Sequence, residues 1–330
     1  MNETIDILLA TFNGEKYIKQ QIESILNQTY SNIRLIISDD CSKDNTREIL
    51  KQYEEKDKRV TIYFQENNLG YVKNFEFLLT KFENEIYMLS DQDDYWLPEK
   101  VEHTYNKLKE DDADLVFTDL EVVDENLNTI YPSFNDFMLL SRKIKKYINT
   151  DKLQLLYNCV TGCTLMSKKK YLDVILPIPL ISKYAIHDTW IACAVSNMGK
   201  TTYLDEKTIK YRQRGNNQVG TDKISHKFKE LDQVRELFLE VKLGLFKTYV
   251  ENDRIFNEKQ KKQNKEALNY FEMLQNKKHI NFRNWNVFHN LYKTETFSYY
   301  MLNFLIMNFP GISRIFFKIR YAILKLLGKR

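Results

Sequence analysis

The sequence contains little glycine, and this excludes several kinds of nucleotide-binding loop. Only 9 of its 330 residues are glycine, whereas glycine makes up roughly 7% of an average protein. Neither the G-x-G-x-x-G string of dinucleotide-binding folds nor the Walker A string of P-loop proteins occurs. We therefore expect no glycine-rich phosphate loop in this chain.

Cysteine and net charge are also low. The four cysteines, Cys41, Cys159, Cys163 and Cys193, show no C-x-x-C spacing, so we expect no zinc or redox motif. No basic segment followed by an apolar run opens the chain, which predicts no secretory signal and reduced thiols in a cytoplasmic protein. A net charge of +4 is too small to predict nucleic-acid binding.

The first half of the chain alternates apolar runs with helical patterns. Strands are predicted at 5–10, 33–38, 60–64, 86–90 and 115–118, and helices at 17–26, 44–53 and 71–82, followed by a helix with Pro98 in its first turn. This alternation predicts an α/β fold with a mostly parallel sheet and helices on both faces. Farther along, we expect a strand at 164–167, a buried helix at 189–197 and extended structure at 201–211.

Three polar segments directly follow predicted strands, at 11–14, 38–41 and 90–94. In parallel sheets, ligands bind beyond the carboxyl ends of the strands. The last segment contains Asp91, Asp93 and Asp94, whose charges repel one another unless a cation lies between them. Oxygen ligands suit Mg²⁺ or Mn²⁺. The alternative interpretation is a solvated acidic turn.

Asp39 and Asp40 end the second predicted strand in the same way. A carboxylate at this position could accept hydrogen bonds from a nucleotide base or ribose. Alternatively, Asp40 could begin an Asx turn that leads into the next helix. Both interpretations remain open at this point.

Four motifs together carry a resemblance to a known family. The motifs are Ile7–Gly14, Gln28–Tyr30, Ser38–Asp44 and Asp91–Asp94. In order and spacing they resemble family 2 glycosyltransferases over about residues 1–220. Residues 90–98 and 211–217 are similar to the rhamnosyltransferase-like branch of bacterial polysaccharide assembly. The resemblance implies a GT-A fold with a Rossmann-like sheet, a nucleotide-sugar donor, Mn²⁺ or Mg²⁺ as cofactor, and inversion at the anomeric carbon.

The resemblance also implies roles for individual residues. Ala10, Thr11 and Asn13 would border the nucleotide, Asp40 would hold its base, and Asp39 is a weaker candidate for the same contact. Asp91 would face the ribose or sugar, Asp93 would ligate the metal, and Asp94 would contact the sugar or support the site.

The catalytic base of the family is an acidic residue shortly before a buried helix. Asp188 stands there, and its neighbour His187 could orient it. Trp190 could stack on a sugar, and Trp96 lies just behind the acidic motif. For both tryptophans, packing in the core is the more common role.

Two departures from the family pattern matter. The Q-x-x-R-W string of processive synthases is absent, so polymer extrusion is not predicted. Arg214 stands where relatives with a similar Tyr-Arg-Gln segment often carry histidine, which leaves the third metal ligand open. Arg212 or Arg214 is then predicted to bind the diphosphate, because a guanidinium matches its geometry.

The remainder of the chain, residues 221–330, is predicted to form a helical region after the glycosyltransferase domain of residues 1–220. Within that domain, the nucleotide-sugar half would end near residue 118. Residues 301–330 include six basic residues and no acidic residue. The basic residues interrupt the apolar run too often for a membrane span. This tail could lie in the membrane interface, pack on the protein, or join a dimer. The polar helices at 223–278 could equally form a contact in a homo-oligomer.

The sequence thus predicts a metal-dependent inverting glycosyltransferase. Its first-choice reaction moves L-rhamnose from dTDP-rhamnose to a glycan acceptor, lipid-linked at the inner face of the cell membrane, in assembly of a surface polysaccharide such as a capsule. A UDP-hexose or UDP-N-acetylhexosamine donor is the alternative within this class. Two alternatives belong to other functional classes. One is a non-catalytic component of an assembly complex that binds a nucleotide sugar or a cation. The other is a glycoside hydrolase that uses Asp93 and Asp188.

Overall fold

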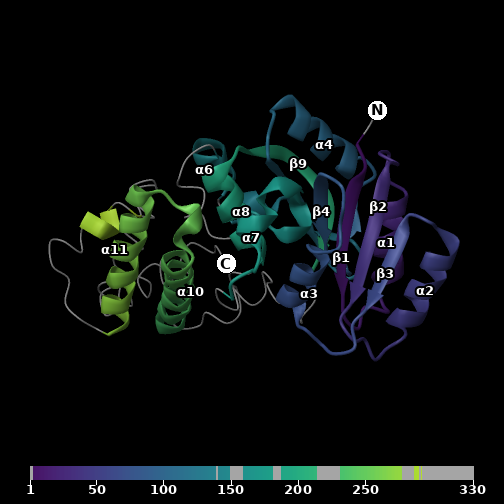
Figure 1. Ribbon diagram of the computed structural model, residues 1–330, viewed down its shortest axis with the longest axis horizontal. Coiled ribbons are helices and arrows are strands. Elements are labelled where there is room, and N and C mark those ends of the chain that lie inside the picture. Colours follow the sequence, from purple (N-terminus) through teal and green to yellow (C-terminus); the bar gives the residue numbers. More distant parts are fainter. Residues whose placement is uncertain are drawn as a thin grey trace, which may run out of the picture. The chain divides into compact units, whose positions relative to one another are not determined.

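The computed structural model describes residues 3–138, 140–148, 159–180, 187–213, 231–276, 286–289 and 291. The chain divides into two compact units (Figure 1). One comprises Met1–Leu180 and Ala185–Asn217, and the other comprises Ile181–Tyr184 and Gln218–Arg330.

The first unit is built on a mixed sheet. Its strands are β1 (Ile5–Thr11), β2 (Ile33–Asp39), β3 (Val60–Phe64), β4 (Ile86–Ser90), β5 (Tyr95–Trp96), β6 (Leu115–Val123), β7 (Thr129–Tyr131), β8 (Leu165–Lys168) and β9 (Thr201–Arg212). They lie in the order β3-β2-β1-β4-β8-β6-β9-β5, with β7 paired to β6. Strands β3, β2, β1 and β4 are parallel, whereas β8 is antiparallel to both β4 and β6. The predicted α/β fold class is confirmed.

Helices connect these strands. They are α1 (Ile18–Leu26), α2 (Thr46–Lys56), α3 (Tyr71–Leu78), α4 (Lys100–Glu110), α5 (Phe134–Phe137), α6 (Ser141–Tyr147), α7 (Leu172–Ile175) and α8 (His187–Met198), with short 3₁₀ turns η2 (Gly162–Thr164) and η3 (Lys169–Tyr171). The prediction that Pro98 lies in the first turn of α4 is wrong, because the helix begins at Lys100. The amide of Leu97 donates to Thr208 O at 3.0 Å, which keeps the segment before Pro98 extended beside β9.

Strand β1 shows how the sheet is covered on both faces. Successive side chains of a strand point to opposite faces, and Ile7, Leu8 and Leu9 are all fully buried. Ile7 and Leu9 share an apolar cluster with Ile22 of α1, to which Leu8 does not belong. Helix α3 also packs on β1, and none of its residues lies in that cluster. Burying each large aliphatic side chain stabilises the fold by about 1.5–3 kcal/mol.

The order of the strands places the predicted polar segments together. The chain adds β2 and β3 on one side of β1 and then returns to add β4 on the other side. Thr11 pairs with Asp39, and Leu9 pairs with Ser90. The carboxyl ends of β1, β2 and β4 therefore share one edge of the sheet, beside the change in strand order where such folds bind ligands.

The second unit contains α10 (Leu231–Glu251), the 3₁₀ turn η4 (Asp253–Ile255) and α11 (Glu258–Gln275). The rings of Phe246 and Phe271 stack across the two helices at 5.6 Å. A capping box of Asn257 and Gln260 begins α11. Among the helices of the described ranges, none combines the length and apolar character that a membrane crossing requires. The tail at 301–330 lies outside the described residues, so its predicted contacts stay predictions.

Candidate active site

The Gln92 side chain joins the loops that follow β1 and β4. Its Oε1 accepts hydrogen bonds from Thr11 Oγ1 at 2.6 Å and from Phe12 N at 2.8 Å, and its Nε2 donates to Phe12 O at 3.1 Å. A Cβ atom at Gly14 would lie 2.5 Å from Gln92 Oε1 and 2.8 Å from Thr11 Oγ1. Any other residue at position 14 would therefore force the Gln92 amide or the Thr11 hydroxyl to shift. No role was predicted for Gln92, although it stands between the carboxylates of the acidic motif.

Gly14→Ala should separate the two loops. The added methyl group would displace the Gln92 amide, and we expect a loss of about 1–3 kcal/mol in the free energy of unfolding. Urea denaturation measures this loss. Lys19→Ala, an exposed change on α1, is the control and should stay within about 0.5 kcal/mol of the parent. An equally small change for Gly14→Ala would show that the loops adapt.

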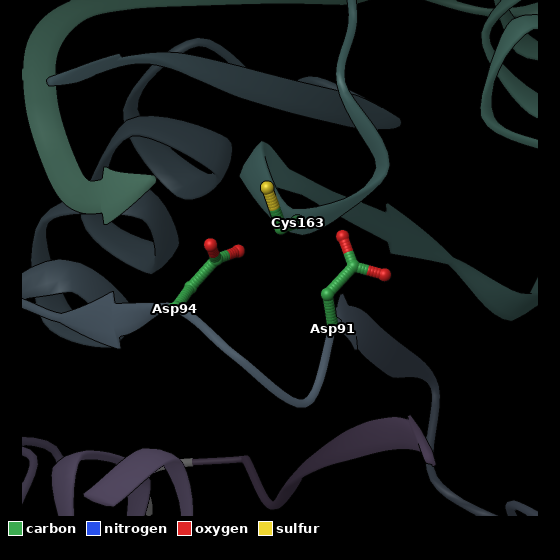
Figure 2. Close-up of side chains that lie close together, drawn as sticks. All are labelled: Asp91, Asp94 and Cys163. Atoms are coloured by element: carbon green, nitrogen blue, oxygen red, sulfur yellow. The ribbon is translucent and has the colours of Figure 1, made fainter. Parts of the chain in front are cut away.

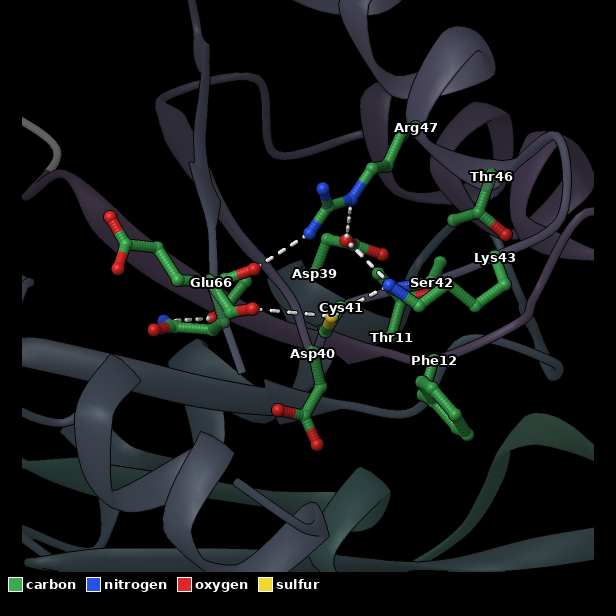
Figure 3. Close-up of polar contacts among 12 residues, drawn as sticks. Thr11, Phe12, Asp39, Asp40, Cys41, Ser42, Lys43, Thr46, Arg47 and Glu66 are labelled. Atoms are coloured by element: carbon green, nitrogen blue, oxygen red, sulfur yellow. Dashed lines mark hydrogen bonds and ion pairs between the residues drawn. The ribbon is translucent and has the colours of Figure 1, made fainter. Parts of the chain in front are cut away.

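The segment after β2 is held by buried hydrogen bonds (Figure 3). Asp39 is fully buried, and its Oδ2 accepts from Arg47 Nε at 2.6 Å and from Ser42 N at 3.1 Å, while its Oδ1 has no hydrogen-bond partner. The two carboxylate oxygens of Asp40 accept from Leu69 N at 2.6 Å and Gly70 N at 2.9 Å. Asp40 thus ties the start of α3 to β2. The alternative that Asp40 begins an Asx turn is wrong, because its carboxylate reaches across to a distant loop.

The loops after β1 and β2 are also cross-linked. Asn13 Oδ1 accepts from Lys43 N at 2.8 Å, and Asn13 N donates to Ser42 Oγ at 2.9 Å. Asn13 has a φ of 49°, a left-handed conformation that asparagine tolerates better than most residues. Ala10 is half-buried beside this loop. The predicted nucleotide-bordering residues therefore lie in one hydrogen-bonded frame.

Three side chains from two segments converge beyond the end of β4 (Figure 2). They are Asp91, Asp94 and Cys163, and their ligand atoms all lie within 4.8 Å of one another. Asp94 is only 1% exposed, its Oδ1 accepts from Arg212 N at 3.1 Å, and its Oδ2 is buried without a hydrogen-bond partner. Burial, and then the charges of Asp93 and Asp91, raise the pKa of Asp94 well above its usual range. A divalent cation fits this arrangement, because its charge would offset the repulsion.

Asp93 is buried but does not belong to this converging group. Its charge acts on Asp94 more strongly than that of Asp91 does. Asp93 therefore lies close to the cluster, and its role as a metal ligand stays a prediction.

Asp188 stands at the start of α8 and is half-buried. Its Oδ2 accepts from Gly162 N at 3.0 Å, and its Oδ1 accepts from Thr189 N at 2.6 Å. Both bonds orient the carboxylate without enclosing it. A partly exposed carboxylate, which an acceptor hydroxyl can reach, suits the role of a general base.

His187 packs behind this carboxylate. Its ring stacks on Phe75 with 4.2 Å between centroids, and its Nδ1 is buried without a hydrogen-bond partner. Burial lowers the pKa of His187 against the opposing charge of Asp188, so the imidazole is neutral near pH 7. A Cβ atom at Gly162 would lie 3.1 Å from His187 Nε2, so glycine at this position permits the tight packing.

The turn η2 joins the predicted base to the acidic cluster. Gly162 donates its amide hydrogen to Asp188, and the next residue, Cys163, directs its thiol toward Asp91 and Asp94. Adjacent residues of one turn thus contact the predicted base and the acidic cluster.

A second connection runs through the start of α3. Gly70 donates its amide hydrogen to Asp40. Burial, and then the charge of Asp188, raise the pKa of the adjacent Tyr71, which places Tyr71 near the predicted base. The start of α3 therefore links the segment after β2 to the neighbourhood of Asp188.

Residues 6–175 match the family model described as Glycosyl transferase family 2. The chain belongs to this family. A dTDP-rhamnosyl transferase of Shigella flexneri, RfbG, is 30% identical over 240 residues, which cover 69% of this chain and 79% of the relative. The predicted family membership is confirmed, and this glycosyltransferase is a transferase enzyme.

Two solved structures share the fold. S. aureus TarS 1–349 in complex with UDP-GlcNAc is 17% identical, with a TM-score of 0.56 over 88% of this chain and 81% of TarS. The mannosyltransferase PcManGT of Pyrobaculum calidifontis, in complex with GDP-Man and Mn²⁺, is 12% identical, with a TM-score of 0.55 over 100% of this chain and 89% of PcManGT. At these identities the similarity establishes the GT-A fold.

Arg212 of the glycosyltransferase supports the acidic motif from behind. Its Nε donates to Asp93 O at 2.8 Å, and its guanidinium also bonds to Glu125 O and to Gln20 Oε1. The side chain is buried over the ring of Tyr17. Its donors are thus engaged by the protein, and the structure does not support the predicted diphosphate contact by Arg212. Arg214 lies outside the described residues.

Both candidate tryptophans of the glycosyltransferase lie in the core. Trp190 is fully buried, and its Nε1 donates to Ile175 O at 2.8 Å. Trp96 is 1% exposed beneath Lys100. Neither ring is accessible to a sugar. The stacking role considered for Trp190 is therefore wrong, and both tryptophans pack in the core as the more common role predicts.

Lys100 is a buried cation next to the acidic cluster. Its Nζ donates to Thr208 Oγ1 at 3.3 Å. Burial lowers the pKa of Lys100 to about 8, although the charges of Cys163 and Asp94 oppose this shift. The sequence offered no signal for this residue, because only the tertiary structure buries it.

This pKa predicts a pH-dependent stability. Between about pH 8 and pH 10.5 the unfolded chain binds a proton that the folded chain lacks, so the contribution of Lys100 to stability rises with pH. In buffer with EDTA, the free energy of unfolding of the parent should rise relative to that of Lys100→Met by up to about 3 kcal/mol across this window. Urea titrations at both limits measure the difference. A constant difference would contradict the lowered pKa.

Proposed function

We propose that this glycosyltransferase moves a sugar from a nucleotide-sugar donor to a glycan acceptor with inversion, with dTDP-L-rhamnose as the first-choice donor. One observation supports the proposal most directly. Within η2, the amide of Gly162 donates a hydrogen bond to Asp188, and the thiol of the next residue, Cys163, lies close to Asp91 and Asp94. A proton acceptor and a cation-binding group thus flank one region. The 30% identity to a dTDP-rhamnosyl transferase supports the choice of sugar.

The reaction follows from these positions. An Asp188 oxygen takes the proton of the acceptor hydroxyl while the acceptor oxygen forms its bond to the anomeric carbon. On the opposite face, the bond from that carbon to the diphosphate oxygen breaks, and its electron pair leaves with the nucleoside diphosphate. A divalent cation bound by the acidic motif would neutralise the charge that grows on this leaving group.

Mn²⁺ or Mg²⁺ is the proposed cofactor. The buried, unpartnered oxygen of Asp94 and the nearby charges of Asp91 and Asp93 support a cation at this position. The presence of Mn²⁺ in PcManGT is consistent with this choice. Asp93 is the ligand that the family resemblance proposes.

The proposed acceptor is a lipid-linked glycan at the inner face of the cell membrane, in assembly of a surface polysaccharide. The basic, apolar sequence of the tail at 301–330 supports this location. The full chain should cosediment with vesicles that contain anionic lipid. A double change, Lys318→Glu with Arg320→Glu, should weaken cosedimentation, and binding that is independent of both would contradict the membrane role.

A panel of nucleotide sugars tests the donor. Each of dTDP-rhamnose, UDP-glucose, UDP-GlcNAc and GDP-mannose is added to the purified chain with Mn²⁺, and the melting temperature is recorded. The true donor should raise it, because a ligand that binds only the folded state stabilises that state. Transfer to an acceptor then separates an enzyme from a non-catalytic binding protein. Stabilisation by none of the four would contradict the proposal.

A further inference from the structure

We propose that Cys163 is a metal ligand, which makes the cation site of this protein a mixed site of two carboxylates and one thiolate, with Asp91 and Asp94. The proposal deepens the proposed function, because it concerns the cation of the same active site. It adds a thiolate to the oxygen ligands that the family resemblance implies, and it leaves Asp93, whose charge acts on Asp94, as a further carboxylate beside the site.

The geometry of the three side chains supports the assignment. The Cys163 sulfur and one carboxylate oxygen from each aspartate all lie within 4.8 Å of one another, and Figure 2 shows all three directed into one space. Atoms about 2.0–2.3 Å from a common ion would fit within this separation. The residues come from two distant segments, the loop after β4 and the turn η2, so the site exists only in the folded chain.

The burial of Asp94 also favours a cation at this position. Asp94 is 1% exposed, its Oδ2 has no hydrogen-bond partner of ordinary geometry, and the side-chain donor that faces its carboxylate is the weakly donating thiol of Cys163. An unsatisfied buried carboxylate oxygen costs free energy unless a cation or donor faces it. Asp91 is only half-buried, so it leaves an entry for an ion from the edge of the sheet.

The thiol changes which ions the site prefers. Carboxylates suit Mg²⁺ and Mn²⁺, whereas a thiolate selects softer ions such as Zn²⁺ and Co²⁺. The proposed site should therefore bind Co²⁺ or Zn²⁺ more tightly than Mg²⁺. The other buried thiols of the described chain, Cys159 and Cys193, are absent from the converging group.

Cobalt absorption tests the proposal without donor or acceptor. All proteins are full-length and carry Cys41→Ser, which removes the half-buried thiol beside the nucleotide loops. Titration of this parent with Co²⁺ should produce a sulfur-to-cobalt charge-transfer band in the near ultraviolet. Cys163→Ser should abolish the band and weaken Co²⁺ binding at least about tenfold. Cys193→Ser, a buried thiol within α8, is the matched control and should keep both.

Zinc X-ray absorption on the parent gives a second measurement that needs no further variant. One equivalent of Zn²⁺ should show one sulfur neighbour at about 2.3 Å together with oxygen neighbours. Absence of sulfur from the zinc shell, absence of the cobalt band in the parent, or persistence of the band in Cys163→Ser would overturn the proposal. Because no sugar is present, these failures leave the transferase reaction untouched. Conversely, an intact band without turnover on any donor would count against the proposed function alone.

Discussion

Replacing Asp188 by asparagine is expected to lower kcat by about 10²–10⁴-fold, the usual contribution of a general base. The amide of asparagine cannot take the proton of the acceptor hydroxyl. Its oxygen can still accept the hydrogen bond that Gly162 N donates at 3.0 Å, so the turn η2 should keep its conformation. Donor affinity should therefore change little. Initial rates at saturating donor and acceptor measure kcat, and calorimetry measures the donor Kd.

The control for this change is Asp173→Asn. Asp173 is an exposed carboxylate at the start of α7, and its removal should leave kcat near that of the parent. If Asp188→Asn and Asp188→Ala both retain near-full activity, Asp188 is not the base. A combined loss of kcat and of donor affinity would instead indicate that the carboxylate shapes the donor site.

Removing divalent cations should cost the enzyme about 10²–10³-fold in kcat, comparable to the loss of a principal electrostatic stabiliser. The leaving diphosphate develops charge, and the surrounding carboxylates of Asp91, Asp93 and Asp94 would otherwise repel it. Dialysis against EDTA should abolish most transfer, and Mn²⁺ or Mg²⁺ should restore it. Asp93→Ala should show the same loss without rescue by either ion at the concentrations that restore the parent.

Glu110→Ala serves as the control for the acidic change, because Glu110 is exposed at the end of α4, away from the loops of the site. It should respond to EDTA and Mn²⁺ as the parent does. Full activity in the presence of EDTA would show that the reaction needs no divalent cation. That result would revive the hydrolase interpretation, whose paired carboxylates need no metal.

Local sequence patterns predicted the elements of the fold closely. The runs at 5–10, 33–38, 60–64 and 86–90 became β1 to β4. Strands β1, β2 and β4 are buried almost throughout, and strands buried on both faces are nearly continuously apolar. The start of α4 was missed, since the bond from Leu97 N to Thr208 O joins residues far apart in the chain. No local pattern contains such a bond.

The candidate site divides in the same way. The acidic motif was singled out from the chain, because charged residues directly after an apolar strand stand out in a sequence, whereas Asp188 was proposed through the family resemblance. Cys163 did not stand out, since a single cysteine in an apolar stretch usually packs as a small apolar side chain. The hydrogen bonds of Arg212 could not be predicted, because its partners Asp93, Glu125 and Gln20 lie in three separate segments.

By itself, the order of motifs determined the family and the class of fold, since both are encoded in residues that are neighbours along the chain. Only the tertiary structure decided which groups share the site. In the folded chain, Asp40 accepts hydrogen bonds from Leu69 and Gly70. Trp190 is buried in the core, and Cys163 lies beside Asp91 and Asp94. The physical reason is that burial and hydrogen bonding between distant segments depend on how strands and helices pack, which local sequence does not specify.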